Sequence, residues 1–379
     1  MIRKIIHIVR DLPSRLRRKK HCIVIEETET SVTVSEGRVS ELERRIRIVN
    51  RLSGTSLDDF TTPFFRADYL VFATHGKRAT TVQNTVHLSR TDPGREVDDR
   101  EFEDLIFRGL WEYFSEYRGF SSKKMGVGEG DIVLAEVSIS ELAMDGHTIV
   151  NPVGITGKKL SIRFRGTFLA KETAEREEKL KSWAREVFTT ESRGTLSAFI
   201  AGENDVVLFC GEENSSAFSA RTDRVLFAGD IKWSSSAMLE ELESSFGIDR
   251  ENARAIFERY AQGDVSSTCL NFCDRILSKH LRTFLESVTT RQRRGGSPPL
   301  TMHAVFSFPI PKHIHWLKNT SRFKINSLEE RFSELGFHAE KTEDTSVATN
   351  IFAFYPALFP KNELANKLLS RRTKWINKK

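Results

Sequence analysis

The chain is 379 residues long, with 39% hydrophobic and 29% charged residues and a formal net charge of +6. This balance is typical of a globular protein with a substantial core and excludes an intrinsically disordered chain. The length suffices for two or three domains of ordinary size. The apolar runs fall short of the roughly 18 residues that a membrane-spanning helix needs, so no span is expected.

Cysteine usage and the first residues bear on the compartment. The four cysteines are scattered, match no zinc-binding spacing and are accompanied by no histidine cluster: Cys22, Cys210, Cys269 and Cys273. Scattered thiols in a chain of this length indicate a reducing compartment. Arg10 and Asp11 interrupt the first apolar run, which argues against a secretory signal. We therefore expect a cytoplasmic protein without a bound metal.

Positive charge gathers at both ends of the chain, in residues 1–20 and 361–379. Such segments bind an anionic membrane surface or nucleic acid, or remain solvated tails. Residues 1–20 are interpreted as a basic N-terminal arm, either a short amphipathic helix limited by Pro13 or a solvated tail.

The first half of the chain predicts strands around one long helix. The strand candidates are β-branched or alternating runs, at residues 22–25, 31–34, 46–49, 69–73, 80–89, 131–139, 147–150 and 159–169. Residues 98–118 carry apolar side chains at helical spacing, and Asp98 and Asp99 favour a helix N-terminus there. The strands at 22–25 and 31–34 are interpreted as a hairpin, and from residue 68 onward the order indicates an α+β unit of about 100 residues.

The second half predicts another strand group followed by helices. A charged helix is expected over residues 172–188. Strands are expected at residues 205–210, 215–220, 224–228, 302–308 and 348–355, and helices at 234–246, 249–262, 267–288, 327–336 and 361–379. Residues 290–299, rich in Arg, Gly, Ser and Pro, are interpreted as a linker.

The most specific run is MDGHTIVNPVGITGKKL, residues 144–160. It resembles a signature of the bacterial cell-division actin FtsA, which lies in an inserted strand–helix–strand–strand domain of that family. Its Asp-Gly and Asn-Pro-Val-Gly segments supply the backbone conformations that strand reversals need. Residues 206–210, 224–229 and 249–263 also resemble segments of FtsA and of its relative PilM.

The resemblance implies an α/β fold of the actin-like/sugar-kinase type, a duplicated ribonuclease-H-like fold with two halves around an ATP cleft and an inserted α+β domain. The implied domains follow in chain order: a basic arm over 1–20, a first actin-like subdomain over 21–65 and 170–200, the inserted domain over 66–169, a second actin-like half over 201–359, and an amphipathic membrane helix over 360–379.

The phosphate-binding loops of the family are degenerate in this sequence. The first loop, with its conserved Asp-x-Gly-Thr, corresponds to residues 26–31, which contain no glycine and include Glu29. The second retains Gly211 but has Phe209 in place of the aspartate. The residues expected to line a degenerate nucleotide site are Glu26, Thr28, Gly211, Asn214 and Gly229. Carboxylates facing a triphosphate repel it, so we expect no catalytic residues, no hydrolysis, and either no cofactor or weakly bound ATP.

Residues 361–379 predict an amphipathic helix at the membrane surface. The apolar arc and basic rim that would contact the membrane comprise Leu364, Leu368, Leu369, Trp375, Ile376, Lys367, Arg371 and Lys374. Docking of this helix on its own domain is the alternative.

Three functions are compatible with these patterns. The first is a division scaffold or tether resembling FtsA, peripheral on the inner face of the cell membrane. The resemblance implies the tubulin-like FtsZ as its partner, together with the anionic membrane surface and self-association, and no nucleic acid or small-molecule substrate. The second is a PilM-like assembly protein of a pilus or secretion system, a class that generally lacks a lipid-binding helix. The third is an active actin-like ATPase.

Overall fold

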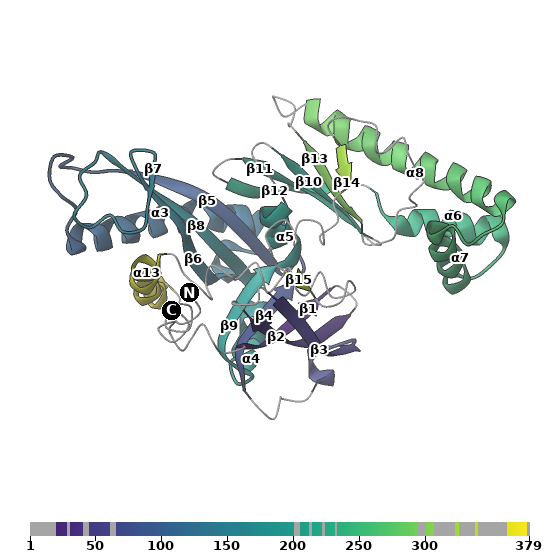
Figure 1. Cartoon of the computed structure of the whole chain (residues 1–379), viewed down its shortest axis with the longest axis horizontal. Coiled ribbons are helices and arrows are strands. Elements are labelled where there is room, and N and C mark those ends of the chain that lie inside the picture. Colours follow the sequence, from purple (N-terminus) through teal and green to yellow (C-terminus); the bar gives the residue numbers. More distant parts are fainter. Residues whose placement is uncertain are drawn as a thin grey trace, which may run out of the picture. The chain divides into compact units, whose positions relative to one another are not determined.

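The structure, a computed structural model, describes residues 20–28, 31–40, 45–60, 66–200, 205–211, 214–221, 224–231, 233–293, 301–306, 323–325, 338–339 and 362–376 (Figure 1). It divides into two units, Met1–Phe199 with Leu328–Lys379 and Ile200–Ser327. The predicted basic arm before Lys20, the helix over 327–336 and the strand over 348–355 lie outside the described residues or almost wholly so.

The first unit contains a sheet in the order β15-β3-β2-β1-β4-β9. Its strands are β1 (Lys20–Glu27), β2 (Val32–Ser40), β3 (Arg45–Gly54), β4 (Ala67–Thr74), β9 (Ala184–Glu191) and β15 (His338–Ala339). The first three strands form an antiparallel meander, β4 runs parallel to β1, and β9 runs parallel to β4. The short helix η1 (Leu57–Asp59) follows β3, and α4 (Lys171–Leu180) and α5 (Ser192–Ile200) flank β9 in sequence.

The second unit contains strands in the order β14-β13-β10-β11-β12. Counted from β12, this order corresponds to β3-β2-β1-β4-β9 of the first unit. Its strands are β10 (Val206–Cys210), β11 (Ser215–Arg221), β12 (Arg224–Ile231), β13 (Met302–Phe306) and β14 (Phe323–Ile325). Here too three strands form an antiparallel meander, and two further strands add in parallel beside the first. The helices α6 (Ser235–Phe246), α7 (Arg250–Gln262) and α8 (Ser267–Arg293) pack through a core that includes Leu242, Phe257 and Phe284.

Two sheets with the same order and the same strand directions define the duplicated ribonuclease-H-like architecture. In the first sheet, β4 and β9 extend the meander next to its first strand, β1. In the second, β13 and β14 extend it in the same way next to β10. The predicted actin-like/sugar-kinase fold class is therefore confirmed.

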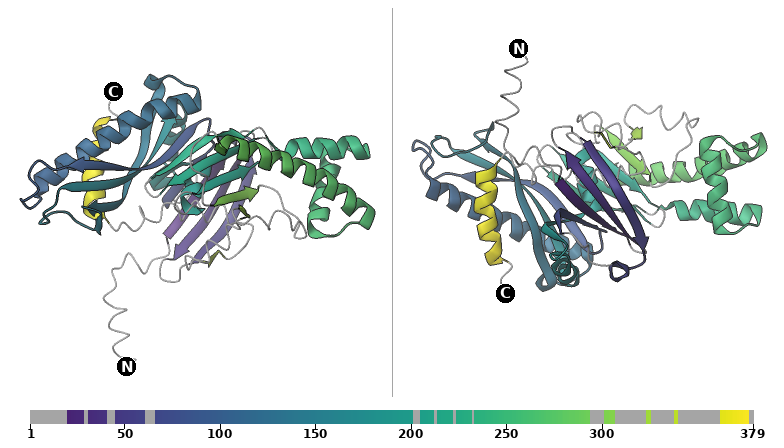
Figure 2. Two further views of the ribbon diagram at one scale, coloured as in Figure 1. Left: turned by 90° about the horizontal axis from the view of Figure 1, so that it is seen from above. Right: turned by 60° about the horizontal axis from the view of Figure 1, so that its bottom comes forward.

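An inserted layer of strands and one long helix lies between β4 and α4 in the sequence (Figures 1 and 2). Its strands, in the order β5-β8-β6-β7, are β5 (Ala79–Ser89), β6 (Ile132–Met144), β7 (His147–Ile149) and β8 (Lys159–Ala170). The helix α3 (Asp99–Met125) packs along this sheet, and the short helix η2 (Glu129–Asp131) leads into β6. Without β7, which is only three residues long, the order is the strand–helix–strand–strand order that the resemblance implied.

The core of the inserted layer depends on one close approach between helix and sheet. Tyr113 of α3 is fully buried, and its hydroxyl donates to the Val82 carbonyl oxygen at 2.8 Å. A Cβ added to Gly166 of β8 would lie 2.8 Å from the Tyr113 hydroxyl oxygen. Glycine at this position therefore lets the tyrosine ring lie flat on the strand.

Several predicted boundaries differ from the structure. The domain boundary at residue 66 placed the strand over 67–74 in the inserted domain, but β4 pairs with β1 and β9 in the first sheet. The predicted helix over 172–188 ends at Leu180, and its last residues belong to β9. Two helices are longer than predicted, since α3 continues to Met125 and α8 continues through residues 290–293 of the predicted linker.

Candidate functional site

The parallel strands β1, β4 and β9 end together at one edge of the first sheet. Glu26 is level with Ala73, and Thr74 is level with Glu191. Ligands of open α/β sheets bind outside the carboxyl ends of parallel strands. This edge is therefore the place in the first unit where a phosphate-binding group is expected.

A buried carboxylate, Glu27, lies at this edge. The Glu27 side chain is only 5% exposed and forms ion pairs with Arg78 and Arg176, the latter at 2.6 Å. The Thr74 hydroxyl donates to the second Glu27 oxygen at 2.9 Å. Both arginines contact the same Glu27 oxygen, so an anion that reached this edge would have to compete with that carboxylate for them.

The sequence predicts Glu26 and Thr28, on either side of Glu27, as residues of the nucleotide site. Glu26 is half-buried and Thr28 is exposed. The Thr28 N–H donates to the Ser31 carbonyl oxygen at 2.9 Å, and the Ser31 N–H donates to the Thr28 hydroxyl oxygen at 3.0 Å. Thr28 therefore closes the β1–β2 turn, while the residues between, Glu29 and Thr30, lie outside the described part of the chain.

A second buried carboxylate, Glu191, ends β9. Its Oε2 accepts a hydrogen bond from the Gly194 N–H at 2.8 Å, which caps the first turn of α5. Lys124 Nζ lies 3.6 Å from the same oxygen, and both side chains are almost fully buried. The opposite charges of Lys124 and Glu191 neutralise each other, so we interpret Glu191 as a structural cap of α5.

A hydroxyl network continues from Glu191 into the inserted layer. Thr81 Oγ1 lies 3.0 Å from Thr167 Oγ1 and 3.1 Å from Thr190 Oγ1, and Thr190 in turn contacts Thr195. Arg165 donates to the Thr195 hydroxyl oxygen at 2.8 Å. These polar groups satisfy one another at the junction of β5, β8 and β9.

Arg165 also lies near a group of acidic residues. Burial, followed by the charge of Glu177, raises the pKa of Glu136 to about 8, with Arg165 opposing the shift. Burial lowers the pKa of Arg165 to about 10. Among the described residues no group of three or more His, Cys, Asp or Glu side chains is arranged to hold a metal ion.

The predicted residues of the second unit lie around the β10–β11 turn and in β12. Gly211 is buried; its N–H donates to the Ser215 hydroxyl oxygen at 3.2 Å, and its carbonyl oxygen accepts from the Ser235 N–H at 3.0 Å. Half-buried Asn214 precedes β11. Gly229 has φ 136° and pairs with Ala217 at a β-bulge. The amide that a phosphate loop would present to its ligand is thus bonded within the turn.

The signature run proves to be a set of turns. Asp145 and Gly146, with φ 49° and 89°, form the two-residue connection from β6 to β7. The Asp145 carboxylate accepts from the backbone N–H groups of Lys158 and Lys159, the latter at 2.8 Å, and these hydrogen bonds lower its pKa. The run therefore fixes the start of β8 against the β6–β7 hairpin.

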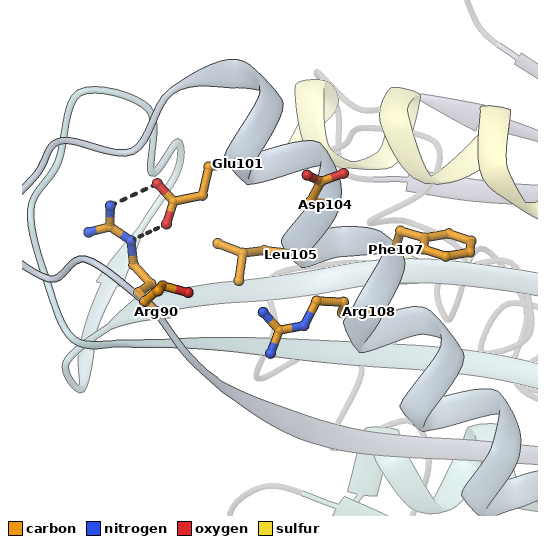
Figure 3. A pocket seen from close by; sticks show the side chains of 7 residues that line it. Arg90, Glu101, Asp104, Leu105, Phe107 and Arg108 are labelled. Carbon is orange, nitrogen blue, oxygen red and sulfur yellow. Dashed lines mark hydrogen bonds and ion pairs between the residues drawn. The ribbon is translucent and has the colours of Figure 1, made fainter.

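A cavity of about 310 Å³ lies beside the N-terminal half of α3 (Figure 3). Arg90 and Glu101 line it and bond each other through two N–H···O contacts of 2.7 and 2.9 Å. Arg90 also donates to the Gly157 carbonyl oxygen at 2.9 Å. The hydrogen bonds of its guanidinium group thus link α3 to the turns of residues 144–160, and this wall of the cavity has a structural role.

The helix predicted over residues 361–379 is observed as α13 (Glu363–Ile376), and it packs on β6 and α3 (Figures 1 and 2). Of the predicted membrane-facing residues, Leu369 is 1% exposed, Leu368 half-buried and Leu364 41% exposed, while Lys367 and Arg371 are exposed. The side chains of Lys374, Trp375 and Ile376 lie outside the described part. No helix that the structure describes is both long and apolar enough to cross a membrane.

No protein-family model matches this chain, and no curated protein matches it. Solved structures do match. A PilM–PilN type IV pilus biogenesis complex is 12% identical, covers 94% of this chain and 98% of its own, and has a TM-score of 0.47. The ethanolamine utilization protein EutJ from Carboxydothermus hydrogenoformans is 9% identical over 90% and 91%, with a TM-score of 0.36.

The cytoplasmic domain of EpsL, from the type II secretion system of Vibrio cholerae, is 7% identical over 86% of this chain and 95% of its own, with a TM-score of 0.32. The actin-like fold of the chain rests on the matching order of its two sheets. At these identities and TM-scores the matches assign no function to it.

Proposed function

We propose that the chain is a non-catalytic scaffold with an actin-like fold, resembling FtsA, that attaches an assembly to the inner face of the cell membrane. By the resemblance of residues 144–160, the assembly is the division apparatus and the partner is the tubulin-like FtsZ. In this proposal the fold supplies surfaces, and its nucleotide site is degenerate.

The observation that carries the non-catalytic part is the Glu27 cluster. A triphosphate at the carboxyl edge of the first sheet would meet a buried carboxylate, and it would have to compete with that carboxylate for Arg78 and Arg176. Like-charge repulsion in a partly desolvated site lowers affinity for the anion. The internal hydrogen bond of the Gly211 amide supports the same conclusion in the second unit.

Titration with a fluorescent ATP analogue in the presence of Mg²⁺ tests this part. We expect no saturable binding up to millimolar nucleotide and no phosphate release. Saturation at micromolar concentration that disappears with EDTA would refute it and would favour an actin-like ATPase.

A PilM-like role in pilus or secretion assembly is the second candidate, and one observation favours it. A lipid-binding C-terminal helix would distinguish an FtsA-like protein from a PilM-like one. In the structure this helix, α13, is packed on its own unit, with Ala365 and Leu369 each 1% exposed. A fluorescent fusion distinguishes the candidates: a midcell ring supports division, whereas polar or envelope foci support pilus or secretion assembly.

A further inference from the structure

One edge of β6 is only partly covered by a strand. β6 pairs with β8 along one side, and on the other side the only described strand that pairs with it is β7, at Leu142–Met144. An open strand edge presents unpaired N–H and C=O groups that seek partners. The part of this edge before Leu142 is where α13 packs.

A single side chain of α13 takes the place of a neighbouring strand. The Ile139 N–H donates to Asn366 Oδ1 at 2.8 Å, and Asn366 Nδ2 donates to the Ile139 carbonyl oxygen at 3.0 Å. Both main-chain groups of Ile139 therefore point away from β8 and toward the helix. The amide of Asn366 reproduces the pair of bonds that an added strand would make.

The docked face of α13 differs from the face predicted to enter a membrane. Leu369 is buried in the docked helix and also belongs to the apolar arc predicted to enter a membrane. Asn366 contacts β6 and is not among the residues predicted to contact a membrane. Leu364 belongs to the predicted arc and keeps 41% of its surface exposed in the docked helix. Because Leu369 cannot pack on the protein and insert into lipid at the same time, the two states exclude each other.

We propose that α13 is a reversible cover of the β6 edge, which leaves that edge when it binds an anionic lipid surface, and that Asn366 holds the covered state. The inference rests on the membrane attachment of the proposed function. Exposed Lys367 and Arg371 attract α13 to anionic headgroups while it is still docked. Release then opens the backbone of β6 around Ile139 to pairing with an extended peptide.

Co-sedimentation of the full chain with phosphatidylglycerol–phosphatidylcholine vesicles tests the exchange. Asn366→Ala removes two hydrogen bonds from the covered state, and we expect it to raise the apparent vesicle affinity about tenfold. Ser370→Ala is the matched control. Ser370 is exposed on the same helix, and its replacement by alanine raises the helix propensity by a similar amount without removing a contact with β6. It should stay within about twofold of the wild type.

Leu364→Ser serves as the opposite variant. Leu364 keeps 41% of its surface exposed in the docked helix and belongs to the predicted membrane-contacting arc, so its loss should lower vesicle affinity about fivefold without releasing the helix. Hydrogen exchange of the Ile139 amide in the wild-type chain gives a second readout. Anionic vesicles should accelerate it, and neutral phosphatidylcholine vesicles should not.

The outcomes separate the two proposals. Equal vesicle affinity of the Asn366→Ala and Ser370→Ala variants, or an Ile139 amide that stays protected in the vesicle-bound chain, would overturn the cover while leaving membrane attachment intact. Absence of vesicle binding by every variant, including Asn366→Ala, would overturn membrane attachment itself and with it the lipid-driven release.

Discussion

Replacing Glu27 by glutamine is expected to destabilise the first unit by about 2 kcal/mol. Glutamine keeps the volume and an acceptor for Thr74 but removes the charge between Arg78 and Arg176. Removing one partner of a fully buried ion pair costs about 3–5 kcal/mol. Here Glu27 is 5% exposed but the arginines are 35% and 30% exposed, so water takes up part of their solvation and the cost falls.

A double-mutant cycle with Arg176→Met isolates the pair. Since Arg78 remains on the same oxygen, we expect a coupling free energy of about 1 kcal/mol between Glu27 and Arg176. Native-state hydrogen exchange of β1 and β4 peptides at rising urea concentration measures the free energy of opening for the first unit, separately from the second. A change below about 0.5 kcal/mol in Glu27→Gln, or zero coupling, would show that the cluster is solvated and that Glu27 does not block the anion position.

Further predictions address the core, the pH dependence and the thiols. Gly166→Ala should lower the free energy of unfolding by about 1–3 kcal/mol, because the new methyl group meets the Tyr113 ring, and thermal unfolding would show it. Glu136, whose pKa is about 8 when folded and lower when unfolded, should cost stability as pH rises from about 4.5 to 8. Glu136→Gln should flatten this slope in urea unfolding measured at each pH. Burial raises the pKa of Cys22 and of Cys273 to about 12, so iodoacetamide at pH 8 should leave both unmodified in the native chain and alkylate them in urea.

Sequence patterns predicted elements whose residues interact mainly with their neighbours in the chain. The three-strand meanders and the helices after β12 follow from alternation, turn residues and caps such as Asp249, whose carboxylate accepts from the Asn252 N–H. The extension of α3 beyond residue 118 was missed, although Gly126, which adopts the left-handed conformation, is a residue typical of a helix end.

Parallel pairing could not be predicted in the same way. Residues 184–188 continue a charged, helix-favouring run, yet they pair with β4 across more than 100 residues of sequence. Contacts with a neighbouring strand override local propensity in such a segment. For the same reason β4 was grouped with the strands that follow it, although its partners are β1 and β9.

The arginine cluster lies one residue away from a carboxylate that the sequence selected. Comparison with a family loop selected Glu26 for the aspartate position, while the arginine cluster forms on Glu27. Successive side chains of a strand point to opposite faces, so one position decides which carboxylate meets Arg78 and Arg176. Those arginines come from a loop and a helix distant in the sequence, and no local pattern announced them.

At two places in the chain, a side chain makes the contacts that a bound partner could otherwise make. Glu27 supplies to Arg78 and Arg176 the anion that a bound phosphate would otherwise provide. Asn366 supplies to Ile139 the paired donor and acceptor that an added strand would otherwise provide. An anion that reached this edge of the sheet would have to displace the Glu27 carboxylate, which is 5% exposed. The two bonds of Asn366 come from one amide on a helix with two buried apolar side chains, and water can replace them. Exchange at the β6 edge therefore costs less than exchange at Glu27, which is why we place the proposed regulation at the β6 edge.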